Sequence, residues 1–102
     1  MSVLVNFAIF PTDKGTSVSA EVSEVINSIA QSGFSYKLNA MGTVFETNTM
    51  DQALGIIRKA YQILESHERV YLVANMDIQK NKNSRLYSKV ESIERKIGKV
   101  EK

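Results

Sequence analysis

A short turn between two strand-forming segments is the feature that most constrains how this chain can fold. Residues 36–48 read Tyr-Lys-Leu-Asn-Ala-Met-Gly-Thr-Val-Phe-Glu-Thr-Asn. Strand-forming residues flank the turn, and Gly42 permits a positive φ there, so we predict a β-hairpin. The turn sets the register of both strands, and the assignment of side chains to the two faces of the hairpin depends on that register.

Glu46 occupies an unusual position in this hairpin. Side chains alternate between the two faces of a strand, so Glu46 shares a face with Val44. The opposite face carries Thr43, Phe45 and Thr47. If helices cover the face of Glu46, its carboxylate must be paired, protonated or matched by a cationic or hydrogen-bond-donating ligand. The alternative is a glutamate at the frayed end of a strand, in contact with water.

Two strand patterns and two helix patterns surround the hairpin. Apolar residues alternate with others in residues 3–10 and 70–78, which predicts two more strands. Apolar residues recur at helical spacing from about residue 18 to residue 31 and from about residue 50 to residue 66. The chain therefore runs strand, helix, strand, strand, helix, strand.

The ends of the two helices carry recognisable signals. Thr16 or Ser17 can cap the first helix, and Gly33 suits the position after its C-terminus. Thr49 and Gln52 form a Thr-x-x-Gln capping box for the second helix.

A third helical pattern follows the last strand. Its apolar positions are Leu86, Val90, Ile93, Ile97 and Val100. Because this apolar seam is narrower than the stripes of the first two helices, we expect the helix to pack along an edge or against a second chain.

This order of elements predicts an α+β fold: a ferredoxin-like βαββαβ sandwich with an additional C-terminal helix, in a single domain spanning residues 1–102. Both long helices should cover one face of a four-stranded antiparallel sheet. The other face would carry Leu4, Phe10, Phe45, Tyr71 and Val73. So much exposed apolar surface predicts dimerisation of sheet against sheet.

Composition excludes several classes of function. The chain has no cysteine, which rules out disulfides, thiolate catalysis and cysteine-ligated metals. A net charge of +2 produces no strong field for nucleic acid or acidic membranes. No segment has the length of a membrane span, and the N-terminus does not resemble a signal peptide, so we expect a cytoplasmic protein.

Catalytic and nucleic-acid motifs are also missing. The single histidine, His67, falls at a helix end, where a cation interacting with the helix dipole is its expected role. No P-loop, dinucleotide fingerprint, nucleophile elbow or zinc spacing occurs, so we expect no enzyme and no metal site. A basic turn and helix start is formed by Lys80, Lys82, Arg85 and Lys89, which favours nucleic-acid binding. The helix that follows has mixed charge, however, and the strands lack the aromatic pattern of RNA-binding sheets.

A small-molecule site uses the residues better. Phe7, Ile9, Met41 and Val44 could wall an apolar slot between strands and helix. Thr43 and Glu46 would then supply its polar groups. The alternative for Phe7 and Ile9 is an ordinary place in the core.

Four stretches of the sequence resemble the small thiamine-binding protein family. They are residues 10–15 (Phe-Pro-Thr-Asp-Lys-Gly), 17–19 (Ser-Val-Ser), 41–46 (Met-Gly-Thr-Val-Phe-Glu) and 89–94 (Lys-Val-Glu-Ser-Ile-Glu). The resemblance implies a βαββαβ domain that forms homotetramers as dimers of dimers. It also implies binding of thiamine or its hydroxymethylpyrimidine part, without established catalysis.

The resemblance points to particular residues. Met41, Gly42, Thr43 and Glu46 fall on the Met-Gly-Thr-x-x-Glu motif of the family. The chain departs from the family at residues 77–80, Asp-Ile-Gln-Lys, where an Asp-Asp-Arg-like run is common.

We therefore predict a cytoplasmic, non-catalytic binder of thiamine or a related aminopyrimidine, with no cofactor beyond that ligand. A carboxylate can accept a hydrogen bond from the exocyclic amine of the ring while aromatic and methionine side chains contact its faces. The predicted site residues are Phe7, Met41, Gly42, Thr43, Phe45 and Glu46. The alternative is a ferredoxin-like regulatory or protein-interaction module without a small-molecule ligand.

Overall fold

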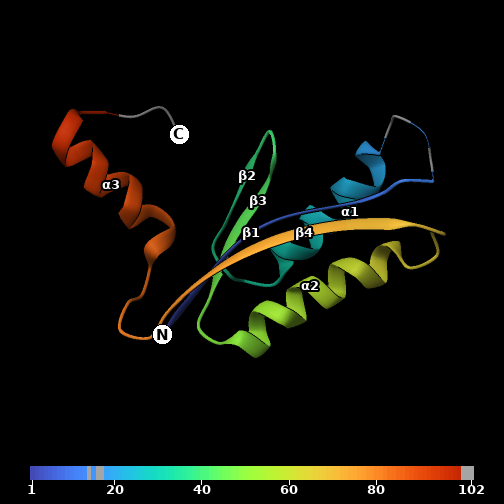
Figure 1. Cartoon of the computed structure of the whole chain (residues 1–102), viewed down its shortest axis with the longest axis horizontal. Coiled ribbons are helices and arrows are strands. Elements are labelled where there is room, and N and C mark those ends of the chain that lie inside the picture. Colours follow the sequence, from blue (N-terminus) through green and yellow to red (C-terminus); the bar gives the residue numbers. More distant parts are fainter. Residues whose placement is uncertain (14, 16–17, 100–102) are drawn as a thin grey trace.

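The computed structural model describes residues 1–13, 15 and 18–99 and has the predicted α+β architecture (Figure 1). Its elements are β1 (Ser2–Pro11), α1 (Ser19–Gln31), β2 (Tyr36–Asn39), β3 (Gly42–Thr47), α2 (Met50–Leu64), β4 (Val70–Gln79) and α3 (Arg85–Ile97). The strands form one antiparallel sheet in the order β2-β3-β1-β4, which confirms the ferredoxin-like prediction.

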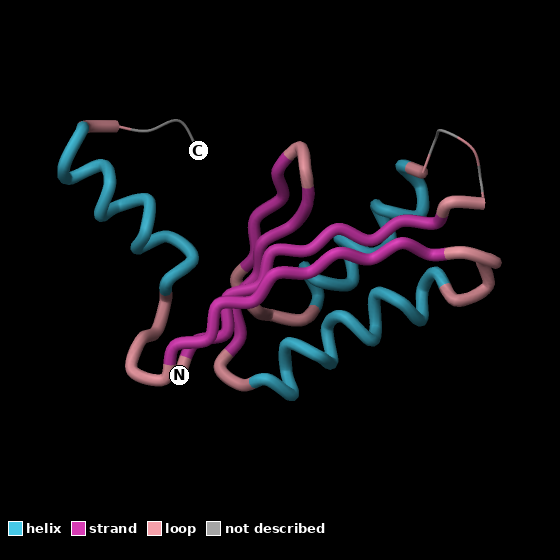
Figure 2. Tube along the Cα trace, in the orientation of Figure 1, coloured by secondary structure: helices cyan, strands magenta, loops and turns pink. Residues whose placement is uncertain are grey.

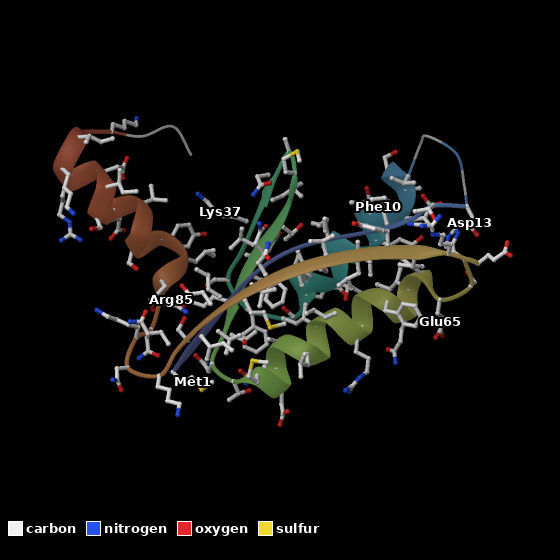
Figure 3. The ribbon with its side chains drawn as sticks, viewed as in Figure 1. Met1, Phe10, Asp13, Lys37, Glu65 and Arg85 are labelled. Atoms are coloured by element: carbon white, nitrogen blue, oxygen red, sulfur yellow. The ribbon has the colours of Figure 1, made fainter. Side chains whose placement is uncertain are left out.

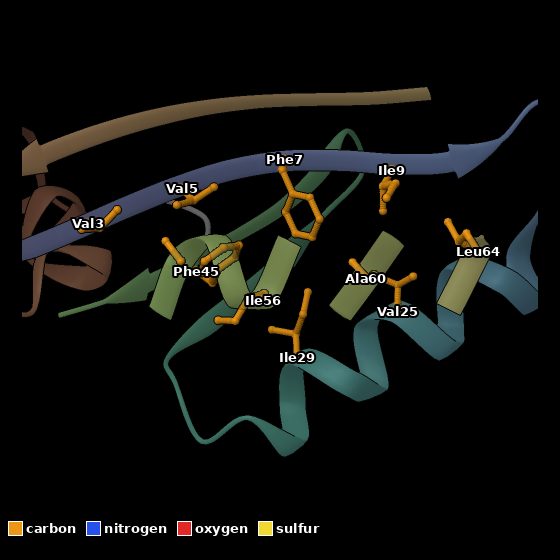
Figure 4. Close-up of a cluster of buried hydrophobic side chains, with 11 residues drawn as sticks. Val3, Val5, Phe7, Ile9, Val25, Ile29, Phe45, Ile56, Ala60 and Leu64 are labelled. Carbon is orange, nitrogen blue, oxygen red and sulfur yellow. The ribbon is translucent and has the colours of Figure 1, made fainter. Parts of the chain in front are cut away.

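The core lies between one face of the sheet and helices α1 and α2, as predicted (Figure 4). The first strand contributes every second residue, namely Val3, Val5, Phe7 and Ile9. The helices contribute Val25, Ile29, Ala53, Ile56, Ala60 and Leu64. The alternation in β1 thus directs one complete set of apolar side chains into the core.

Phe45 belongs to this core, so the prediction that its side chain lies on the open face of the sheet was wrong. The register places Phe45 opposite Val5, and residues directly opposite in a sheet share a face. The ring is fully buried and meets Phe7 edge to face, with 5.5 Å between ring centroids. The open face does carry Tyr71 and Val73, which are 49% and 44% exposed.

The hairpin turn differs from the prediction at Gly42. The turn residues are Ala40 and Met41, and Gly42 is the first residue of β3, without a positive φ. Instead, the Met41 N–H donates to Asn39 Oδ1 at 2.9 Å, which stabilises the turn. Gly42 is needed for close packing, because a Cβ there would lie 2.8 Å from the carbonyl oxygen of Phe7.

Most of the predicted helix-end signals are confirmed. Gly33 has φ +83° immediately after the C-cap of α1, and Thr49 and Gln52 form the complete capping box of α2. Helix α2 ends at Leu64, slightly before the predicted Ser66. The predicted caps of the first helix, Thr16 and Ser17, lie outside the described residues, and so does Val100 of the third helical pattern.

Helix α3 packs on the body through its first turn only and then projects away from it (Figure 1). Leu86 is buried, whereas Ile93 and Ile97 are 50% and 75% exposed. The residue before the helix, Ser84, has the left-handed φ of 54° and gives no side-chain cap. Beyond its first turn, the apolar seam of α3 is therefore largely uncovered by the described part of the chain.

Candidate functional site

A groove opens beside β1 where the β2–β3 hairpin ends. We call it the hairpin groove. It encloses about 290 Å³ and is lined by residues 7–10 of β1, by Val22, Val25 and Ile26 of α1, and by residues 38–43 of the hairpin. None of these lining residues carries a charge, so the groove is suited to an uncharged, mainly apolar ligand.

The groove exists because β1 is longer than its neighbour in the hairpin. Strand β4 pairs with β1 over residues 2–11, whereas β3 pairs only with residues 3–7 (Figure 2). Beyond Phe7 the edge of β1 has no strand beside it, and α1 passes over the space with Val22, Val25 and Ile26. The unequal strand lengths thus leave a hollow against an edge of the sheet.

Of the two polar side chains that line this groove, Asn39 accepts from the Met41 N–H through Oδ1, and the other is Thr43. The residue is only 4% exposed, yet its hydroxyl has no hydrogen-bond partner in the part of the chain that the structure describes. Thr47, on the same face of β3, instead donates to the carbonyl oxygen of Thr49 at 2.9 Å. The hydroxyl oxygen is not among the completely enclosed polar atoms, so it remains accessible from the groove and is suited to bind a ligand that enters there.

Glu46 lies on the other face of β3, where both of its carboxylate oxygens accept hydrogen bonds. Oε2 accepts from the Ser2 hydroxyl at 2.5 Å and from the Arg85 N–H at 2.8 Å, and Oε1 accepts from the Leu86 N–H at 3.1 Å. Glu46 therefore provides the N-terminal cap of α3 that Ser84 does not supply.

Arg85, labelled in Figure 3, completes this polar cluster. We call the cluster the α3 anchor, and it consists of Ser2, Glu46, Asp77 and Arg85. The arginine is 4% exposed. Its guanidinium donates to the hydroxyl and carbonyl oxygens of Ser2, both at 3.0 Å, and to Oδ2 and the carbonyl of Asp77 at 2.8 and 2.5 Å. The anchor holds the start of α3 against the ends of β1 and β4.

The anchor also shifts the pKa of Glu46. Burial alone would raise that pKa, but the bonds from the Ser2 hydroxyl and the two N–H groups, together with the nearby guanidinium of Arg85, lower it below its ordinary value. The carboxylate is thus stabilised in its charged form by the protein itself.

A second, more polar hollow of about 320 Å³ lies beside the anchor. Its lining includes Glu46, Asn48, Ser35 and the rings of Phe34 and Tyr87. Since both carboxylate oxygens of Glu46 already accept hydrogen bonds, this hollow offers a ligand mainly neutral polar groups.

The opposite end of the sheet carries another polar contact (Figure 3). His67 Nδ1 lies 3.0 Å from Asp13, and the Glu68 N–H donates to Asp13 at 2.7 Å. The bond from Glu68, followed by the contact with His67, lowers the pKa of Asp13 despite partial desolvation. His67 therefore links the loop after α2 to the loop after β1, beyond its predicted role at a helix end.

The structure separates the predicted site residues into three groups. Phe7, Met41, Gly42 and Thr43 line the hairpin groove. Phe45 lies in the core beside Phe7, and Glu46 belongs to the α3 anchor. Within the described residues, no group of three or more metal-binding side chains occurs, and no helix is long and apolar enough to cross a membrane.

Sequence reasoning missed two contributions. The α1 residues of the groove follow helical spacing, but that pattern marks any packed helix and gives no sign of a ligand. Arg85 was assigned to a basic turn, because nothing in its local sequence reveals that the fold buries it.

Comparison with known proteins identifies the family. A sequence model of the thiamine-binding protein family matches residues 5–94. This chain belongs to the thiamine-binding protein family. Its predicted resemblance to that family is thereby confirmed.

Curated relatives and solved structures are similar to this chain over most of its length. A UPF0045 protein of Mycobacterium bovis is 30% identical over 96 residues, covering 93% of this chain and 94% of the relative. The crystal structure of a Methanocaldococcus jannaschii protein matches with a TM-score of 0.80 and 30% identity, over 90% of this chain and 95% of that one. A Thermotoga maritima protein provisionally assigned to thiamine biosynthesis or salvage shares the fold, with a TM-score of 0.77 and 15% identity, over 91% of this chain and 99% of that one.

Proposed function

We propose that this member of the thiamine-binding family binds thiamine or a related aminopyrimidine in the hairpin groove, in the cytoplasm and without catalysing a reaction. The observation that carries the proposal is the hydroxyl of Thr43, which lines a largely apolar groove and has no hydrogen-bond partner among the described residues. Family membership supports the class of ligand, and Met41, Gly42 and Thr43 of the family motif supply part of the wall.

The chemistry of the groove suits the pyrimidine part of such a ligand. Apolar side chains from β1 and α1 can cover the flat ring, and the Thr43 hydroxyl can donate to a ring nitrogen or accept from the exocyclic amine. The thiazolium of thiamine is a cation, and none of the described residues that line the groove is acidic. The pyrimidine therefore enters, while the charged ring stays toward solvent.

Isothermal calorimetry with thiamine and with hydroxymethylpyrimidine tests the proposal. Wild-type protein should bind at least one of them. Thr43→Val keeps the shape of the side chain but removes the hydroxyl, and it should weaken binding about 3- to 10-fold, the effect of one neutral hydrogen bond.

Ser35→Ala is the matched control, because it removes a hydroxyl from the polar hollow beside Glu46. Its affinity should equal that of the wild type. If Ser35→Ala weakens binding and Thr43→Val does not, the ligand occupies the polar hollow, and the proposed site is wrong. Absence of binding to both compounds would refute the ligand class.

We further propose that the protein assembles as a homotetramer, a dimer of dimers, with the open sheet face as one contact. The rings of Phe10 and Tyr71 contact each other on that face in a tilted arrangement, with 5.7 Å between ring centroids, and Val73 lies exposed on it. Apolar surface of this kind favours association. Sedimentation equilibrium should show a tetramer for the wild type and smaller species for Tyr71→Lys.

The same face supports the second candidate, a regulatory or protein-interaction module without a small-molecule ligand. The two candidates differ in the calorimetry: an interaction module shows no heat with thiamine, its precursors or its phosphates. Its open face would then be covered by another protein.

A further inference from the structure

The edge of β1 inside the hairpin groove carries peptide groups whose direction can be worked out. In an antiparallel sheet, the N–H and C=O of one residue point to the same edge, and successive residues alternate between edges. The Thr12 N–H donates to the carbonyl oxygen of Arg69, on the β4 side, at 2.9 Å. Phe10 therefore also faces β4, and Ile9 faces the opposite edge.

The contact at Gly42 leads independently to the same direction. A Cβ at Gly42 would lie 2.8 Å from the carbonyl oxygen of Phe7, so that carbonyl points toward the hairpin. Ile9 follows two residues later and points the same way. The last pair between β1 and β3 is Phe7 with Thr43, so no strand residue stands opposite Ile9 on that side.

Among the described residues, the N–H and C=O of Ile9 therefore have no strand partner on the groove side. No hydrogen bond from a described turn, loop or side chain reaches either group. Ile9 lines the groove and is only 5% exposed, so these two peptide groups lie where bulk water has little access. Buried peptide groups are almost always paired, so this donor and acceptor are suited to a ligand.

The free edge is too short to accept a strand from another chain. Ile9 is followed by Phe10, which faces β4, and then by Pro11, which has no N–H and ends β1. The hairpin closes the groove at its other end. One donor and one acceptor from a single residue match a small planar ring better than the repeated bonds of strand addition.

We propose that the Ile9 main chain recognises the aminopyrimidine edge, as a refinement that rests on the proposed function. The Ile9 N–H donates to a ring nitrogen, and the Ile9 C=O accepts from the adjacent exocyclic amine. The ring binds in its neutral form, because a protonated ring nitrogen would present a donor to the Ile9 N–H, and no carboxylate lines the groove to compensate. Thr43 then contacts a different position of the ring.

Amide hydrogen exchange followed by ¹⁵N NMR tests this contact directly. In the free protein the Ile9 amide should exchange faster than the Phe10 amide, which faces β4. Saturating hydroxymethylpyrimidine should slow Ile9 exchange about tenfold or more and leave Phe10 unchanged, because a new hydrogen bond protects only Ile9.

A ligand analogue provides the second measurement. Replacing the exocyclic amine by a dimethylamino group removes both of its N–H donors and leaves the Ile9 carbonyl without a partner. Affinity should fall about tenfold or more. Lowering the pH until the ring is protonated should also weaken binding to the wild type.

The outcomes separate this inference from the proposed function. If hydroxymethylpyrimidine binds and Thr43→Val weakens binding, but Ile9 exchange is unchanged and the dimethylated analogue binds equally well, the main-chain contact is refuted and the groove remains the site. If Ile9 becomes protected as protein concentration rises without ligand, a second copy covers the edge, and the inference is also refuted. Absence of binding refutes both.

Discussion

Thr43 and Glu46 stand three residues apart on the same strand, yet their surroundings are opposite. Thr43 points into an apolar groove with its hydroxyl unpartnered among the described residues, whereas Glu46 accepts hydrogen bonds on both carboxylate oxygens. Both belong to the Met-Gly-Thr-x-x-Glu motif. The motif therefore combines a ligand-facing group with a structural group, and hydrogen-bond occupancy distinguishes them.

This contrast changes the role expected of the glutamate. The sequence suggests that the Glu46 carboxylate binds a cationic or hydrogen-bond-donating ligand. In the structure, however, the Ser2 hydroxyl and the first N–H groups of α3 already donate hydrogen bonds to it. A charged group that already has hydrogen-bond partners within the protein contributes little additional free energy to ligand binding. A neutral hydroxyl without a partner gains a complete hydrogen bond.

The largest expected effect belongs to Glu46→Ala. The substitution removes the acceptor for the Ser2 hydroxyl and for the N–H groups of Arg85 and Leu86, so it should lower the free energy of unfolding by about 3 kcal/mol. Urea unfolding measures this loss, and hydrogen exchange should locate it at α3. Glu91→Ala on the exposed surface of α3 is the control and should stay within about 0.5 kcal/mol of the wild type.

Ligand affinity provides the other half of this test. Folded Glu46→Ala protein should bind as the wild type does, because Glu46 does not line the hairpin groove. A large loss of affinity with the fold intact would contradict the division of roles between Thr43 and Glu46.

Gly42→Ala should have the next largest effect. The added methyl group would lie 2.8 Å from the Phe7 carbonyl oxygen and force the hairpin away from β1, at a cost of about 1–3 kcal/mol. Binding should weaken as well, because the hairpin forms one wall of the groove. Gly55→Ala is the matched control: it lies within α2 with nothing within 4 Å of its added Cβ, and it should stabilise the protein by up to about 1 kcal/mol.

Two buried threonines on one face of β3 offer a finer comparison. Thr47→Val loses the bond to the Thr49 carbonyl and should cost about 1 kcal/mol. Thr43→Val should change the free energy of unfolding by much less, because its hydroxyl has no described partner to lose. Equal destabilisation of the two variants in urea would show that Thr43 is satisfied within the protein.

The smallest effect is expected from acid. The pKa of Glu46 is lowered in the folded state, so the unfolded state takes up the proton first as pH falls. The stabilising contribution of Glu46 to the free energy of unfolding is complete above its ordinary pKa of 4.5. This contribution is lost as the pH falls through the lowered pKa of the folded state. Urea unfolding measured from pH 7 to pH 3 should show this loss of stability. Glu46→Gln should make the free energy of unfolding depend less steeply on pH, whereas Thr43→Val should leave that dependence unchanged. The pKa of Asp13 is also lowered in the folded state, so Asp13 likewise makes the protein less stable as the pH falls, and both variants retain this effect.

Local signals predicted much of this molecule. Alternation established the strands, helical spacing established the helices, and the capping box of Thr49 and Gln52 marked the start of α2 within a residue. These succeed because each depends on neighbours within a few positions along the chain. The motif also brought Met41, Gly42 and Thr43 correctly to one place.

Predictions failed where the answer depended on a distant segment. Gly42 was explained by a positive φ, but its actual constraint is the Phe7 carbonyl on another strand. Phe45 was assigned to the open face, but its pairing with Val5 places it in the core. In each case, the neighbour that decides the outcome lies more than thirty residues away in the chain.

The amino-acid order alone establishes the α+β class, the order of the elements and membership of the thiamine-binding family, because these follow from short-range periodicity and motif spacing. Only the tertiary structure shows that β1 extends beyond its pairing with β3, so that the Ile9 peptide groups have no strand partner there among the described residues. It also shows that the first N–H groups of α3 donate hydrogen bonds to Glu46. The physical reason is that the pairing of a polar group depends on which segments of the chain lie together in space. The residues next to that group in the sequence do not determine which segments these are.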